Sequence, residues 1–206
     1  MKAKERKEFN ICLCGDTLVG KTCMASYFIE NQSDEFSSKK KWEAIAKFDG
    51  IYYKYKILDT YGKERFRSID IRIVSSCEGF LLVYDVRNRN SFNNLVNWIE
   101  YIKENCDLNK KEFILVGNKN DTDEYQRYVT FEEGLSFAKL KNLMYFETSS
   151  KTGNGIIEVF QTLFEKVYQK YNKIEDLRKH VNNSLNINKR KEELLINDNL
   201  NKFICF

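Results

Sequence analysis

The feature that most constrains the fold of this chain is one short loop, Gly15-Asp16-Thr17-Leu18-Val19-Gly20-Lys21-Thr22. It matches the pattern G-x-x-x-x-G-K-(S/T), which has to follow a strand and open a helix. Residues 9–14 alternate as a strand does, and residues 22–30 have the pattern of a helix. Successive backbone N–H groups in such a loop point at one spot, where the helix dipole also favours an anion. The sequence therefore predicts a phosphate-binding loop.

Side chains at the end of this loop have the chemistry that a phosphate chain requires. Lys21 would reach the terminal phosphates, and the Thr22 hydroxyl would bind Mg²⁺. Asp59 ends a predicted strand, where a carboxylate can hold Mg²⁺ opposite Thr22, directly or through water. We therefore predict that the loop and the following Cys23 bind phosphates, and that Thr22 and Asp59 bind the metal ion.

Apolar runs along the chain predict a mostly parallel sheet. Residues 79–86 and 113–117 are almost unbroken apolar runs, which are typical of strands buried on both faces. Residues 42–48 and 51–58 predict a hairpin with a tight Asp49-Gly50 turn, and residues 144–148 predict a short last strand. Because these strands alternate with helices, we expect a doubly wound, six-stranded α/β domain with helices on both faces and ligands at the strands' carboxyl ends.

Helix signals complete the domain. Ser91 is expected to cap a helix with apolar positions up to Ile102, and Thr130 with Glu133 resembles a capping box. The last long helix has an apolar face formed by Ile156, Ile157, Phe160, Phe164 and Val167. From about Asn172 onward apolar residues become sparse, so we expect a tail that is helical at best in part. The expected organisation is an extension (1–7), one domain (8–172) and a variable, partly disordered tail (173–206).

Composition and charge exclude several classes of protein. No run of about 18 apolar residues predicts a membrane-spanning helix, and the charged residues 1–8 are unlike a signal peptide. The 6 cysteines are scattered, which favours reduced, mostly buried thiols in a cytosolic protein. The net charge of +4 is too small to indicate binding to nucleic acid.

Two further polar segments follow predicted strands and should lie at the same edge of the sheet as the loop. They are residues 118–121 and residues 147–151. Guanine presents a paired donor edge, its N1–H and 2-amino groups, which adenine lacks, and a carboxylate accepts both bonds. Asp121 could therefore recognise guanine.

The loop, Asp59-Thr60-Tyr61-Gly62 and these two segments occur here in the order that recurs in the Ras superfamily of small GTPases. The chain resembles that superfamily over roughly residues 8–172, with Ser150 in place of the usual alanine. The resemblance implies that GTP and GDP bind with Mg²⁺ and that the Gly62 N–H binds the γ-phosphate. It also implies that Asn118 and Asp121 select guanine and that Lys119 packs along the base and supports the loop. The residues that would wrap the base from its other side are Ser149, Ser150 and Lys151.

Within the superfamily the chain looks most like the Rab branch. Residues 64–69, residues 82–86 and Trp98 are Rab-like, whereas residues 57–60 and 78–81 are closer to Ras. The Rab resemblance implies a switch in vesicle traffic that works through an exchange factor, an activating protein and effectors. Its expected location is the cytoplasm, at the cytosolic face of an endomembrane. A Ras-type signalling GTPase is the alternative.

The chain departs from the family pattern where catalysis is concerned. Lys63 stands where active members have a glutamine that orients the attacking water. Lysine cannot offer the paired donor and acceptor of an amide, so we expect slow GTP hydrolysis. Tyr61 and Leu18 add bulk near the phosphates.

The segment that usually supplies a threonine to the metal ion is also atypical. Counting about 18 residues on from Thr22 reaches Lys40, which cannot replace the threonine. Ser37 or Ser38 is therefore the candidate metal ligand, and the alternative is that no residue replaces the threonine. Phe36 is the candidate cover for the guanine ring. These departures leave a second function open, a guanine-nucleotide-binding interaction module with impaired catalysis. A kinase acting on a small molecule is a third, disfavoured by residues 118–121.

The tail differs from the usual prenylated ends of the family. Cys205 is the candidate site for a lipid because of its penultimate position, although the double-cysteine and C-a-a-X motifs do not match. The tail holds seven basic and five acidic residues over 173–206, a weak attraction to a membrane.

Overall fold

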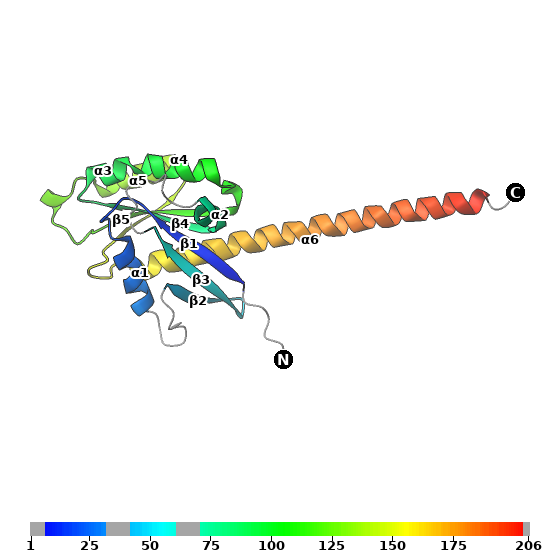
Figure 1. The fold of residues 1–206 in the computed structure, drawn as a ribbon, viewed down its shortest axis with the longest axis horizontal. Helices are drawn as coiled ribbons and strands as arrows, with labels where there is room; N and C mark the ends of the chain where they lie inside the picture. Colours follow the sequence, from blue (N-terminus) through cyan, green and yellow to red (C-terminus); the bar gives the residue numbers. More distant parts are fainter. Residues whose placement is uncertain (1–6, 32–41, 61–70, 204–206) are drawn as a thin grey trace. The chain divides into compact units, whose positions relative to one another are not determined.

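The computed structural model describes residues 7–31, 42–60 and 71–203, whose strands form a single mixed sheet (Figure 1). The strands are β1 (Glu8–Cys14), β2 (Glu43–Phe48), β3 (Ile51–Asp59), β4 (Gly79–Asp85), β5 (Glu112–Asn118) and β6 (Met144–Thr148). Their order is β2-β3-β1-β4-β5-β6, and β2 pairs antiparallel with β3 while every other pair is parallel. This confirms the predicted six-stranded, mostly parallel α/β sheet.

Helices cover both faces of the sheet. They are α1 (Lys21–Glu30), α2 (Ile71–Ser76), α3 (Arg89–Asn93), α4 (Leu95–Asn105), α5 (Phe131–Lys141) and α6 (Ile156–Phe203), with 3₁₀ turns η2 (Leu108–Lys110) and η3 (Glu124–Gln126). Figure 1 shows α3, α4 and α5 together on one face. On that face, buried Cys12, Cys14 and Tyr84 pack with Trp98 of α4.

The opposite face of the sheet is closed by aromatic side chains. Phe28 of α1 stacks on Phe160 at 4.3 Å between ring centroids, and Tyr55 of β3 stacks on Phe164 at 4.1 Å. The Tyr55 hydroxyl also donates to the Phe164 carbonyl at 3.0 Å. The first turns of α6 are therefore fixed to the sheet, as the predicted apolar face requires.

The hairpin turn and one helix cap follow the sequence prediction. Asp49 and Gly50 have positive φ angles of 49° and 76°, the left-handed conformation that a two-residue hairpin turn needs at both central positions. The Thr130 hydroxyl accepts the Glu133 N–H at 3.2 Å, while the Glu133 carboxylate forms an ion pair with Arg89 of α3.

The prediction that Ser91 caps a helix is wrong, because Asn88 does so. The Asn88 side chain accepts the N–H groups of Asn90 and Ser91 at 3.0 and 3.3 Å. Ser91 is buried in the first turn of α3, and its hydroxyl oxygen accepts the Asp85 N–H at 3.1 Å. Asparagine and serine cap equally well, so the residue whose backbone is extended, here Asn88, takes the role.

Helix α6 runs further than its composition suggested. It continues to Phe203, whereas we expected a tail that is helical only in part. The 48 residues from Ile156 to Phe203 contain no glycine or proline, so nothing in them breaks a helix. The chain divides into two compact units, residues 1–168 and 169–206. No helix in the described ranges has an apolar stretch that could cross a bilayer.

The cysteines of the described ranges are free thiols, as expected. Cys12, Cys14 and Cys77 are buried, Cys106 is half-buried and Cys23 is exposed. A hydrogen bond with Cys14 and burial raise the pKa of Cys12, and a hydrogen bond with Cys12 and burial raise the pKa of Cys77, which keeps both thiols protonated and unreactive.

Candidate functional site

The sequence motifs converge because their strands are parallel and end at one edge of the sheet. Leu13 of β1 lies opposite Asp59 of β3, and Asn118 of β5 lies opposite Thr148 of β6. The loop between β1 and α1 follows Cys14 directly. The predicted phosphate-binding, metal-binding and base-binding residues of the described ranges therefore share this edge.

Both glycines of the loop are required by close contacts. Gly15 has φ 143°, and a Cβ there would lie 2.0 Å from the Val83 carbonyl oxygen. Gly20 has φ 102°, and a Cβ there would lie 2.2 Å from Asn118 Nδ2. The backbone of the loop thus lies directly against β4 and the end of β5, closer than any side chain permits.

Lys21 turns back onto its own loop. Its Nζ donates to the carbonyl oxygens of Gly15 and Asp16, each at 2.7 Å, and the residue is 4% exposed. Burial lowers the pKa of this amine, an effect that nearby Asp59 opposes. The ammonium group is therefore buried at the centre of the loop and held by carbonyl groups.

Thr22 and Asp59 meet as predicted. The Thr22 hydroxyl donates to the Asp59 carboxylate, so two oxygens suited to Mg²⁺ stand side by side next to the loop. In the described part of the chain there is no cluster of three or more His, Cys, Asp or Glu that could hold a metal ion. The pair fits Mg²⁺ if phosphate and water oxygens complete the coordination shell, as they commonly do for this ion.

Asn118 joins three segments of the site. It is fully buried, and its Nδ2 donates to the Val19 carbonyl at 2.8 Å. Its Oδ1 accepts the Thr148 hydroxyl and the Ser150 N–H, both at 3.1 Å. One side chain thus fixes the loop after β1 and the segment after β6 to the end of β5.

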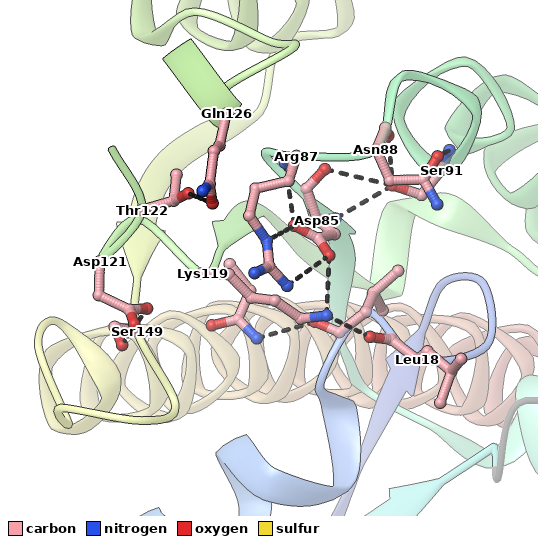
Figure 2. Close-up of polar contacts among 12 residues, drawn as sticks. Leu18, Asp85, Arg87, Asn88, Ser91, Lys119, Asp121, Thr122, Gln126 and Ser149 are labelled. Carbon is pink, nitrogen blue, oxygen red and sulfur yellow. Dashed lines mark hydrogen bonds and ion pairs between the residues drawn. The ribbon is translucent and has the colours of Figure 1, made fainter. Parts of the chain in front are cut away.

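Lys119 makes a second connection between the predicted base-binding segment, residues 118–121, and the loop (Figure 2). Its Nζ donates to the Leu18 carbonyl at 2.6 Å and lies 2.7 Å from Asp85 Oδ2. Asp85, which the sequence analysis missed, also accepts the Arg87 Nε–H at 3.2 Å. Burial raises the pKa of Asp85, but the bonds from Arg87 and Lys119 outweigh it, so the net pKa is lowered. The signal that could have identified Asp85 from the sequence is its position at the end of an apolar strand.

Asp121 is held by the segment after β6. Ser149 is fully buried, and its hydroxyl donates to Asp121 Oδ1 at 2.6 Å, which lowers the pKa of the carboxyl (Figure 2). Lys151 Nζ lies 3.7 Å from Asp121 Oδ2. The N–H groups of Lys151 and Thr152 donate back to the Ser149 hydroxyl oxygen at 3.2 and 3.1 Å. The result is an ionised carboxylate in a fixed position at the edge of the sheet.

A half-buried polar network next to these residues was not predicted. Arg127 donates to both carboxylate oxygens of Glu147, at 2.7 and 2.6 Å. The Tyr145 hydroxyl donates to Glu147 at 2.7 Å and lies 2.8 Å from the Tyr84 hydroxyl. Glu147 immediately precedes Thr148 and Ser149, so this network anchors the chain that supports Asp121.

Asp16 has partners that the loop pattern does not specify. Its carboxylate accepts the Asn94 Nδ2–H at 2.7 Å and the Trp98 indole N–H at 3.0 Å. Both donors come from the α3–α4 segment, about 80 residues further along the chain.

A cavity of ≈ 380 Å³ opens beside the loop, and every residue that lines it is a predicted nucleotide-binding residue. Its walls are Thr17, Leu18, Gly20, Lys21, Thr22, Cys23, Lys119 and Ser150. A larger cavity of ≈ 520 Å³ lies between α1, β2 and α6, but it is lined mainly by apolar side chains such as Phe28, Ile45 and Phe164. We take the smaller cavity as the site because polar groups from three strand ends converge there.

Several predicted residues lie outside the described residues, and their roles stay predictions. They are Phe36, Ser37, Ser38, Lys40, Tyr61, Gly62, Lys63 and Cys205.

Comparison with known proteins identifies the architecture. Residues 10–169 match the model of the Ras family. The Ras-related protein RAB1BV of Beta vulgaris is 36% identical over 169 residues, which cover 78% of this chain and 76% of that protein.

Proposed function

The chain belongs to the Ras family and is a Rab-like small GTPase, and on this premise we propose a specific switch. It binds GTP and GDP with Mg²⁺, hydrolyses GTP slowly and acts in vesicle traffic. One observation supports the proposal above others: Asn118 and Lys119 both donate to carbonyl groups of the loop, at Val19 and Leu18. These contacts hold the proposed base-binding segment directly beside the proposed phosphate-binding loop.

The phosphates bind to the N–H groups of the loop and to Lys21. For that contact the Lys21 amine exchanges the Gly15 and Asp16 carbonyl oxygens for phosphate oxygens. Thr22 and Asp59 hold Mg²⁺, which supplies charge neutralisation between the phosphates. The Thr22 hydroxyl oxygen and an Asp59 carboxylate oxygen would both serve as ligands, in place of the hydrogen bond between them.

The base binds at the other end of the site. Asp121 is ionised and fixed by Ser149, so it can accept the N1–H and 2-amino groups of guanine together. The Lys119 stem lies along the base while its amine stays between Leu18 and Asp85. Ser150 and Lys151 close the base from the side of β6.

Slow hydrolysis rests on Lys63, which lies outside the described residues. A lysine at the position next to Gly62 cannot both donate to and accept from the attacking water. Single-turnover GTP hydrolysis by the wild type and by Lys63→Gln tests this point. We expect the variant to be faster, and an equal rate would contradict the role of Lys63.

We propose a role in vesicle traffic because the chain is similar to a Rab-related protein. An exchange factor, an activating protein and effectors would act on two switch segments, residues 31–41 and residues 61–75. We propose a peripheral location on the cytosolic face of an endomembrane, with Cys205 as the candidate lipid acceptor. A single lipid chain would anchor the protein weakly and reversibly.

A variant with an altered base preference tests the proposed recognition of guanine by Asp121. Asp121→Asn should weaken GDP binding by about a hundredfold, because two charge-assisted bonds are lost. It should strengthen binding of xanthosine diphosphate, because the asparagine amide donates to the 2-carbonyl of xanthine and accepts its N1–H. Displacement of a fluorescent GDP analogue measures both affinities.

The matched control is Asp107→Asn, which changes an exposed aspartate in the turn before β5. It should leave both affinities unchanged. A folded wild type that binds no GDP would overturn the proposed function.

A further inference from the structure

The carboxylate of Asp16 is held by two donors from one face of a helix. Asn94 donates to Oδ2 at 2.7 Å, and the Trp98 indole N–H donates to Oδ1 at 3.0 Å. The Trp98 backbone N–H donates to the Asn94 carbonyl at 3.2 Å, so the two side chains stand one helical turn apart. Each oxygen of the carboxylate therefore has its own donor.

One of these donors is buried in the core. Trp98 is 1% exposed and belongs to the buried cluster that includes Cys12, Cys14 and Phe92. A side chain packed in this way keeps a single rotamer, so its N–H points to a fixed place. Asp16 is consequently tied to the core on the α4 side of the sheet.

The same residue also holds the phosphate-binding lysine. The backbone carbonyl of Asp16 accepts the Lys21 Nζ–H at 2.7 Å. Asp16 thus contacts α4 through its side chain and Lys21 through its main chain. A shift of the carboxylate would move the carbonyl group and the loop N–H groups next to it.

The charge of Asp16 makes this arrangement necessary for an anionic ligand. An ionised carboxylate in a phosphate-binding loop would repel phosphates wherever it approached them. The two neutral donors bind it on the α4 side, and among the described residues that line the ≈ 380 Å³ cavity Asp16 does not occur. The loop therefore offers its N–H groups to the cavity and its acidic side chain to α4.

We propose that Asn94 and Trp98 are positioning residues for nucleotide binding, which hold the phosphate loop in its binding conformation through the carboxylate of Asp16. This inference rests on the proposed function, since it concerns the same site. It assigns a role in nucleotide retention to a helix whose residues touch no part of the cavity.

The rate of GDP release tests the inference. In excess Mg²⁺, Asp16→Ala should release a fluorescent GDP analogue about tenfold faster than the wild type, because each charge-assisted bond alone has about that effect. Asn94→Ala, which keeps Trp98 and its packing, should give a smaller increase. Combining Asp16→Ala with Asn94→Ala should give no further increase, because both changes remove the same contact.

Glu133→Ala is the matched control. It also removes a carboxylate that ties helices on this face of the sheet, through Arg89, but it does not touch the loop. It should leave GDP release unchanged. Unchanged release in Asp16→Ala, or effects of Asp16→Ala and Asn94→Ala that multiply, would overturn the inference while leaving the proposed function intact.

A second measurement detects the contact itself. The chain has 2 tryptophans, so Trp42→Phe leaves Trp98 as the single indole signal in a proton–nitrogen NMR spectrum. We expect Asp16→Ala to shift that signal, since the indole N–H loses a charged acceptor. An unshifted signal would overturn the inference. A wild type that fails to bind GDP would instead refute the proposed function.

Discussion

The two sides of the site differ in what occupies their polar groups. On the proposed base side, Asn118 donates to the loop carbonyl of Val19 and accepts the Ser150 N–H, and Ser149 donates to Asp121. A bound base would not need to replace these partners. On the phosphate side, Lys21 and Thr22 bond to loop carbonyls and to Asp59, partners that phosphate and Mg²⁺ would replace.

This difference assigns recognition of the base and response to the phosphates to different sides of the proposed site. A preorganised base side would lose little entropy on binding, so under the proposed function its preference for guanine would not depend on the state of the phosphate side. The phosphate side would have to exchange its internal bonds for bonds to phosphate and Mg²⁺. Under the proposed function, we therefore expect the contacts that change on nucleotide binding to belong to the loop and to Asp59.

Lys21→Met should give the largest effect, and it addresses the phosphate side. GDP affinity should fall by about a hundredfold or more, since charge-assisted bonds to phosphate are lost. The unfolding free energy of the nucleotide-free protein should stay the same or rise, because burial of the ammonium group opposes folding. Nucleotide titration and urea denaturation measure the two quantities. A clear loss of stability without nucleotide would show that this side is preorganised too.

Glu147→Gln should have an intermediate effect, and it addresses the base side. Arg127 is 18% exposed and would lose its paired carboxylate, so the unfolding free energy should fall by about 2 kcal/mol even without nucleotide. Glu133→Gln breaks the more exposed pair with Arg89, at 39–41% exposure, and should cost under about 1 kcal/mol. Equal losses in the two variants would contradict a structurally fixed base side.

Acid pH should have the smallest effect and should act through the base side. The Ser149 hydroxyl holds the pKa of Asp121 below its usual value of about 4. A lowered carboxyl pKa gives stability that is complete above the usual value and is lost as pH falls through the lowered one. The stability difference between wild type and Asp121→Asn should therefore be constant near neutral pH and shrink in acid. A difference that is already shrinking at pH 6 would contradict the lowered pKa.

The sequence predicted what depends on local pattern. Strand periodicity, the Asp49-Gly50 turn and the loop motif were sufficient for the sheet and for the meeting of Thr22 with Asp59. The pattern could not decide between Asn88 and Ser91 as a cap, because both residue types cap well and only the backbone conformation separates them.

The supporting contacts depended on tertiary placement and could not be predicted in the same way. Asp16 and Trp98 are 82 residues apart, and nothing in the loop pattern specifies an indole partner. Arg127 and Glu147 belong to different elements, and only the register of β6 brings them together. The sparse apolar residues after Asn172 predict a tail that is helical only in part, whereas α6 extends to Phe203 through a segment without glycine or proline.

The bond from Asn118 to Val19 also bears on how the protein folds. It joins residues 99 apart, and Lys119 joins Leu18 across 101 residues. Strand β1 is central in the sheet, yet both of its neighbours, β3 and β4, follow it in the chain. The loop after β1 is therefore made first on the ribosome and completed only when β5 has been added. Under the proposed function, nucleotide would bind only late in folding, so a bound nucleotide would mark chains whose sheet has assembled.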